Sequence, residues 1–107
     1  MMNLKEQLIS AATTHNEAVA IEKAKNIYDK IIEQAKRAAT IGQYSTMLRS
    51  NGFSELYRVS MGENDEVRIR MIQILKNKFK EEGLEFEYIS SCDTFGEDYY
   101  ELRWYKN

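Results

Sequence analysis

The side chains that most often carry out catalysis are scarce in this chain. It contains one histidine, His15, and one cysteine, Cys92. A Ser/His or Cys/His arrangement would have to use His15, which we expect at a helix cap or kink, and Asp93 beside Cys92 opposes the reactive thiolate. One Cys and one His cannot supply the four ligands of a structural zinc site. We therefore expect no catalytic residue, no cofactor and no metal.

Acidic residues near the C-terminus could bind a hard cation or act as an acid–base pair. Segment 93–98 carries three acids around Gly96, but they do not stand at the offsets of an EF-hand loop, and no bidentate Glu closes a twelve-residue frame. Glu85 and Glu101 could mimic a glycosidase pair, but we place them on an exposed strand face without a cleft. The pattern favours a solvated loop and a solvated face.

The charge balance favours a protein partner over nucleic acid. The formal net charge of the chain is −2, and the basic residues in 23–37 and 68–80 are interleaved with acids, as on ordinary solvated helices. Residues 84–107 hold six acids against Arg103 and Lys106 and could meet a basic surface on a partner. The partner-binding residues that we predict are Glu85, Glu87, Asp93, Glu97, Asp98, Tyr99, Glu101 and Tyr105.

Length and composition bound the class of protein. The 107 residues, 43% hydrophobic and 30% charged, are expected to form a single domain over 1–107. A lone cysteine fits a reducing compartment. The longest apolar runs have four residues, and charges interrupt the N-terminal ones, so we expect neither an export signal nor a membrane span. The predicted location is the cytoplasm, or the host cytoplasm if the protein is viral.

The first element that must position these side chains is a helical segment over residues 3–41. Its apolar residues recur at spacings of three and four: Ile21, Ala24, Tyr28, Ile31, Ala35 and Ala38. Thr13 to Asn16 are poor helix formers, and Thr14 with Glu17 has the spacing of a capping box. The segment could form one long helix or two, and we favour a break or kink near 14–16. Gly42 is placed to end the helix.

Residues 43–61 are predicted to be extended or a hairpin. Tyr44, Thr46 and Leu48 alternate with more polar neighbours, and a type I′ turn at Asn51-Gly52 would align Tyr44 with Val59. The alternative continues the helix through Leu48 and ends it at the same Asn51-Gly52 pair. Periodicity alone does not decide between them, and we favour the strand.

A second helix over 64–82 and a β-hairpin over 84–105 complete the domain. The core residues predicted on the helix are Arg68 or Ile69, Ile72, Leu75 and Phe79. On the hairpin, the predicted inner residues are Leu84, Phe86, Tyr88, Tyr100, Leu102 and Trp104, and the outer ones are Glu85, Glu87, Tyr99, Glu101, Arg103 and Tyr105. The predicted fold is α+β, with N-terminal helices and a central helix packed on a small antiparallel sheet.

The N-terminal segment from Asn3 to Thr14 has apolar residues of its own, Leu4, Leu8 and Ile9. One sheet face needs only one or two covering helices, so this segment exceeds what the core of a domain this size requires. An additional amphipathic helix often serves association. We therefore expect a homo-oligomer.

Three stretches carry a pattern of structural positions. They are Ala35–Gly42 (AKRAATIG), Leu75–Gly83, which closes a helix, and Tyr99–Trp104 (YYELRW). Together they resemble small uncharacterised proteins of tailed bacteriophages, in which a helix, a glycine, an extended segment, a second helix and a Trp-terminated hairpin form one unit. The resemblance implies an origin and an architecture, and it attaches no functional residues. Segment 50–62 and the N-terminal helical segment depart from it.

The function that these features favour is a non-enzymatic phage or prophage interaction protein. It would bind a host or viral protein, and inhibition of a host defence system is one such role. One alternative is an oligomeric nucleotide- or small-molecule-binding protein, with a pocket between subunits lined by Tyr and Arg. Another is a virion component or nucleic-acid accessory factor that uses the two basic helices.

Overall fold

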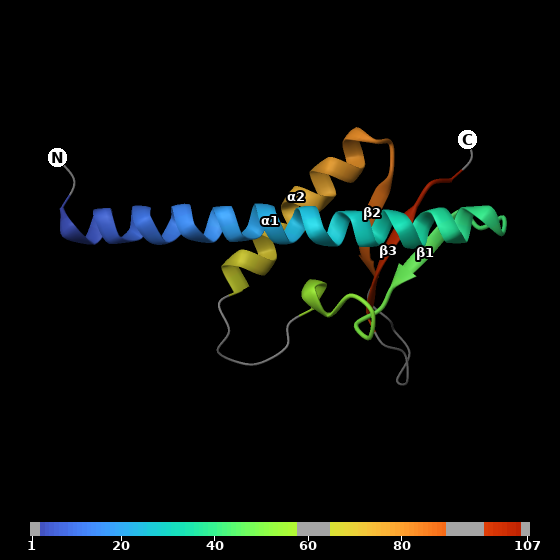
Figure 1. Cartoon of the computed structure of the whole chain (residues 1–107), viewed down its shortest axis with the longest axis horizontal. Coiled ribbons are helices and arrows are strands. Elements are labelled where there is room, and N and C mark those ends of the chain that lie inside the picture. Colours follow the sequence, from blue (N-terminus) through green and yellow to red (C-terminus); the bar gives the residue numbers. More distant parts are fainter. Residues whose placement is uncertain (1–2, 58–64, 90–97, 106–107) are drawn as a thin grey trace.

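Helices pack against a small sheet in the computed structural model (Figure 1). The structure describes residues 3–57, 65–89 and 98–105. The elements in these ranges are helix α1 (Leu4–Thr40), strand β1 (Ser45–Leu48), the short 3₁₀ helix η1 (Ser54–Leu56), helix α2 (Asp65–Glu81), strand β2 (Glu85–Ile89) and strand β3 (Tyr99–Arg103). The α+β class and the C-terminal hairpin predicted from the sequence are confirmed.

Helix α1 is continuous from Leu4 to Thr40, so the break predicted near 14–16 is wrong. The Asn3 side chain caps the helix by accepting a 2.8 Å hydrogen bond from the Glu6 amide. Each poor helix former in 13–16 costs only a few tenths of a kcal/mol, and no Gly or Pro interrupts the segment. The end at Gly42 is as predicted, since Gly42 has a positive φ of 86° and the next amide bonds back to Ala38.

The buried line of α1 differs from the predicted one at two positions. Its members are Ala20, Ala24, Ile27, Ile31, Ala35 and Ala38. Ala20 replaces Ile21, which is 52% exposed, and Ile27 replaces Tyr28, which is half-buried and stacks on Phe79 at 5.1 Å. The contact with α2 selects the small residue of the pair Ala20-Ile21, because small side chains let two helices approach closely.

The three strands form an antiparallel sheet in the order β1-β3-β2. Leu102 in the central strand lies between Thr46 and Phe86. The strand predicted for this part of 43–61 is therefore confirmed, but its partner is β3, and the described residues 53–57 do not pair with it.

The hairpin predicted at Asn51-Gly52 is wrong where the structure describes it. The amides of Gly52 and Phe53 both donate to the Arg49 carbonyl, so the chain makes a helical turn and continues into η1. Phe53 and Leu56 are buried in the core, which offsets the loss of a local strand pairing. Val59 lies outside the described residues.

Helix α2 buries a narrower line than predicted. Leu75 and Phe79 are buried as expected, and Met71 joins them. Ile69 is 49% exposed, and Arg68 and Ile72 are half-buried. The helix ends where predicted, with Gly83 at a φ of 78° and the Leu84 amide bonded to the Phe79 carbonyl at 2.8 Å.

The core lies between the two helices and the inner face of the sheet. Aromatic rings connect these layers, since Phe86 lies 5.3 Å from Phe79 and 5.2 Å from Tyr100. On the inner face Leu48, Phe86, Tyr100 and Leu102 are buried, whereas Tyr88, predicted to be inside, is 51% exposed. The opposite face of the sheet is left for polar side chains.

The N-terminal part of α1 extends beyond this core (Figure 1). A helix of this length measures about 55 Å, and the buried residues begin only at Ala20. Every residue from Asn3 to His15 is exposed. The helix therefore belongs to the core from Ala20 onward. We call residues 4–15, which project beyond the core, the arm of α1.

Two isoleucines, one buried and one exposed, test which residues belong to the core. Ile31 is fully buried and Ile41 is 74% exposed. We predict that Ile31→Ala lowers the free energy of unfolding by about 2–5 kcal/mol, and that Ile41→Ala changes it by less than about 0.5 kcal/mol. Urea unfolding of both variants measures the difference, and equal losses would contradict the core described here.

Candidate functional site

The outer face of the sheet gathers several of the predicted partner-binding residues around Arg103. The guanidinium lies 2.5 Å from a carboxylate oxygen of Glu87, 3.2 Å from one of Glu85 and 3.4 Å from one of Glu101. The Tyr105 ring lies 5.6 Å from the same guanidinium. The strand register places Glu85 opposite Arg103 and Glu87 opposite Glu101, which explains how residues from two strands converge. We call these five residues the Arg103 cluster.

The cluster is tightly packed although it lies on the open side of the sheet. The side chains of Arg103 and Glu101 are only 15% and 16% exposed. Burial by itself lowers the pKa of Arg103, but hydrogen bonding to Glu87 and the nearby charges of Glu87, Tyr105 and Glu85 outweigh it and raise that pKa. Three carboxylates face one guanidinium, so the cluster keeps a net negative charge.

Two other predicted residues that the structure describes, Asp98 and Tyr99, do not belong to this cluster. Asp98 accepts a hydrogen bond from the Tyr88 hydroxyl, and this bond, together with partial burial, raises the pKa of Tyr88 to about 12. Tyr99 is half-buried beside Ile89 on the neighbouring strand. Asp93 and Glu97 lie outside the described residues, as do Cys92 and the rest of the predicted acidic loop.

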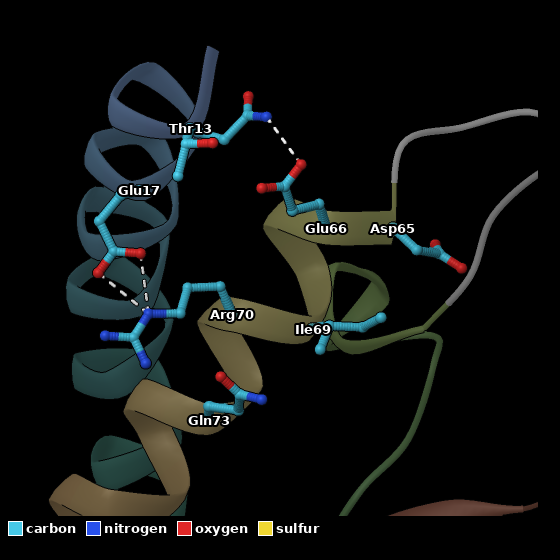
Figure 2. Close-up of a pocket in the computed structure, with 8 residues that line it drawn as sticks. Thr13, Glu17, Asp65, Glu66, Ile69, Arg70 and Gln73 are labelled. Atoms are coloured by element: carbon cyan, nitrogen blue, oxygen red, sulfur yellow. Dashed lines mark hydrogen bonds and ion pairs between the residues drawn. The ribbon is translucent and has the colours of Figure 1, made fainter. Parts of the chain in front are cut away.

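A cleft of about 550 Å³ lies between the arm of α1 and the start of α2 (Figure 2). Its lining residues come from both helices: Thr13, Asn16, Glu17, Asp65, Glu66, Ile69, Arg70 and Gln73. Figure 2 shows Glu17 and Arg70 pointing toward each other, and the guanidinium bonds both carboxylate oxygens at 2.8 and 3.0 Å. Asn16 donates to Glu66 at 3.2 Å.

The polar groups of this cleft are largely used to join the two helices. The hydrogen bond from Arg70, with its charge, lowers the pKa of the Glu17 carboxyl against the opposing effect of burial, and the same bond raises the pKa of Arg70. From the sequence, Glu17 had been assigned to a capping box and Arg70 to a solvated face. Because the two residues are far apart in the chain, local patterns carried no signal for this pair.

A smaller pocket of about 310 Å³ has the Tyr and Arg lining expected of the small-molecule alternative. It is lined by Leu56, Tyr57, Arg68, Tyr88 and Tyr100. The Tyr57 hydroxyl donates to the Leu48 carbonyl and accepts from the Tyr100 amide. Arg68 donates to Asp65 at 3.4 Å and to the Leu56 carbonyl at 3.3 Å. These bonds tie the polar groups to the chain itself, which favours a structural role for them.

The arm of α1 presents an apolar face that the rest of the domain leaves open. Leu4 and Leu8 are 70% and 61% exposed. At about 100° per residue, Leu4 lies about 160° around the helix from Ala20, so the arm's leucines are on the side opposite the core line. We call the exposed residues on this side the N-terminal face: Leu4, Leu8, Ala11, His15 and Ala18. His15 is therefore on an exposed helix surface and not at a kink.

Across residues 3–57, 65–89 and 98–105, no group of three or more His, Cys, Asp or Glu side chains is placed to hold a metal ion. No helix in that part of the chain is both long and apolar enough to cross a bilayer. The Glu85 and Glu101 carboxylates, considered from the sequence as an acid–base pair, instead pair with Arg103.

The packing of Arg103 among three carboxylates predicts that its charge stabilises the folded state. Arg103→Met keeps the aliphatic part of the side chain but leaves three carboxylates without their cation, so we expect the free energy of unfolding to fall by roughly 1–3 kcal/mol. The control is Arg37→Met, because Arg37 and Glu33 form a pair that is more than 70% exposed and should contribute less than about 0.5 kcal/mol. Urea unfolding near neutral pH compares them, and equal effects would contradict the packing of Arg103.

The pair between Glu17 and Arg70 predicts a pH dependence. A carboxyl whose pKa is lowered by folding stabilises the folded state above its unfolded-state pKa, and this contribution disappears as the pH falls through the folded-state pKa. We therefore predict that Arg70→Gln is less stable than the wild type near pH 7, and that the difference shrinks toward about pH 3. Urea unfolding across this range measures it, and a constant difference would contradict the ion pair.

A comparison with protein families, curated proteins and solved structures gives no match for this chain. The function of the chain must therefore be inferred from the arrangement of its own residues: the Arg103 cluster, the two pockets and the N-terminal face.

Proposed function

We propose that this protein is a non-enzymatic interaction protein whose binding element is the N-terminal face of α1. The observation that carries the proposal is the exposure of Leu4 and Leu8 on an arm where every residue from Asn3 to His15 is exposed. Full burial of a leucine side chain contributes about 1.5–3 kcal/mol. A partner that covered this face would recover that free energy, which the isolated domain does not.

The physics of short helices supports a partner for the arm. A helix shorter than about 12–15 residues is marginal in water by itself, because most helical stability in proteins comes from packing an amphipathic face. The arm, residues 4–15, is at the lower end of this range and has no buried residue. An amphipathic helix that docks its apolar face on a partner is a common mode of recognition.

The two pockets give less support to a small-molecule function. In the cleft between the helices, Glu17 and Arg70 pair with each other. In the tyrosine-lined pocket, Tyr57 and Arg68 are bonded to the main chain. A ligand would have to compete with these internal bonds, whereas a partner at the N-terminal face would displace only water.

The Arg103 cluster supplies a second candidate surface. Its net negative charge complements a basic surface, and its packing holds the carboxylates in place before binding, which limits the entropy cost. The resemblance in residues 35–42, 75–83 and 99–104 favours a phage or prophage origin. The protein bound would then belong to the host or to the virus.

Photo-crosslinking tests the binding element in bacterial cells that express the protein. We predict that a photo-reactive phenylalanine analogue at position 8 forms covalent adducts with protein. Position 33 is the control, because Glu33 is also exposed on α1 but lies outside the N-terminal face. The same analogue there should form far fewer adducts. Adducts are detected on denaturing gels and identified by mass spectrometry.

The outcomes separate the two surfaces. An analogue at position 85 reports on the Arg103 cluster in the same experiment, since the Glu85 side chain is 62% exposed. Adducts at position 85 but not at position 8 would move the binding element to the sheet. Equal yields at positions 8 and 33 would contradict a specific role for the N-terminal face.

A further inference from the structure

We propose that the occupant of the N-terminal face is the same face of a second copy of the chain, packed antiparallel. This inference depends on the proposed function, because it names the partner of the same surface. It goes further in giving the chemistry of that partner, the direction of its helix and the residues that meet.

The spacing of the face is that of a helix that pairs with another helix. Leu4, Leu8, Ala11, His15 and Ala18 follow one another at intervals of 4, 3, 4 and 3 residues. This is the a/d pattern of a coiled-coil seam, and a seam needs a second helix to fill the spaces between its side chains. Within the described residues these five are all exposed, so the chain itself does not supply that second helix.

Antiparallel pairing matches large side chains with small ones across the seam. When residue 13 lies at the two-fold axis, Leu8 of one copy faces Ala18 of the other, and Ala11 faces His15. Leu8 and His15 then each meet the methyl group of an alanine, which allows close packing, and Leu4 faces Glu22 at each end of the seam. A two-fold axis makes the contact self-complementary, so one short sequence supplies both halves of the interface.

The charges at the ends of the face also favour the antiparallel direction. The next position in the pattern is Glu22, an acid that ends the apolar seam. In the register above, Glu22 faces Leu4 of the other copy, next to Lys5 and near the N-terminal end of that helix. The positive end of the helix dipole and the lysine both attract the carboxylate. A parallel pair would instead place Glu22 against Glu22 and bring two positive helix ends together.

The size of the face predicts a weak and reversible dimer. Standard stable interfaces use about 20–30 residues from each partner, and the N-terminal face has five, with flanking side chains around them. We therefore expect a dissociation constant that is about micromolar or weaker. The two copies should exchange with concentration and should not form a permanent dimer.

Sedimentation velocity over a wide concentration range tests self-association of the purified full chain. We expect the wild type to shift from monomer to dimer, and Leu8→Glu to raise the dissociation constant by about 100-fold or more, because it buries two carboxylates. Glu has nearly the helix propensity of Leu, so the helix should persist. Ile41→Glu is the control, since Ile41 is exposed outside the face and should not change the constant.

A variant that should tighten the dimer excludes misfolding as the explanation. His15→Leu replaces a polar side chain of the seam with an apolar one, so we expect the dissociation constant to fall by about tenfold. An increase or no change would contradict the placement of His15 inside the interface.

Disulfide trapping tests the direction of the helices, with Cys92→Ser as the background. In the antiparallel register, position 8 of one copy faces position 18 of the other, whereas the two copies of position 8 are about 15 Å apart. Leu8→Cys mixed with Ala18→Cys should therefore form a cross-linked dimer on oxidation, and Leu8→Cys alone should not. Efficient cross-linking of Leu8→Cys alone would overturn the antiparallel arrangement.

The failures of this inference and of the proposed function are distinguishable. A wild-type chain that stays monomeric at every concentration, while the analogue at position 8 captures a different protein in cells, would overturn the second copy and leave the interaction function intact. A monomeric chain without adducts at position 8 would overturn both.

Discussion

The packing of one line of residues on α1 determines the arrangement of the rest of the domain. Ala20, Ala24, Ile27 and Ile31 form the buried line, and their small or compact side chains let α2 and the sheet lie close to the helix. The residues of α1 that contribute to the core begin at Ala20. Since α1 continues for four further turns in the N-terminal direction, the same rigid helix that carries the core also holds its own N-terminal end away from that core (Figure 1).

A three-stranded sheet with helices on one face only must solve a second problem, because its other face meets water. Here the solution is electrostatic. Arg103 lies on the central strand, where carboxylates from β2 and from β3 itself can all reach it. The central position also buries most of the guanidinium, so the interactions are screened less than those of ordinary surface pairs. The outer face thus gains order from charged side chains, which lie beside the partly exposed Met47 and Tyr105.

The alternation of apolar and polar residues and the positions of the glycines predicted much of this fold. The wrong predictions share a physical cause. The inner and outer faces of β2 and β3 followed from a period of two, and the helix ends followed from Gly42 and Gly83, where a positive φ is required.

Local preference failed where distant residues decided the outcome. The buried line runs through Ala20 and not Ile21 because of α2, and β1 pairs with β3 and not with the described residues 53–57 that follow Asn51-Gly52. The Arg103 cluster was foreseeable as a set of residues on one face, but the convergence on Arg103 depended on strand register. The ion pair between Glu17 and Arg70 joins two helices and had no local signature.

The two faces of α1 also bear on how the proposed surfaces would work together. The N-terminal face lies on the opposite side of the helix from the core line, so two copies could pair through their arms without any change inside either domain. The sheet packs beside the C-terminal half of α1, away from the arm (Figure 1). Pairing through the arms would therefore leave both Arg103 clusters open to solvent.

Two weak contacts with a partner that offers two basic surfaces would then reinforce each other, because the second contact forms at a high effective concentration. A small domain whose single surfaces bind weakly could reach useful affinity in this way, and the length of the arm would set the spacing of the two contacts.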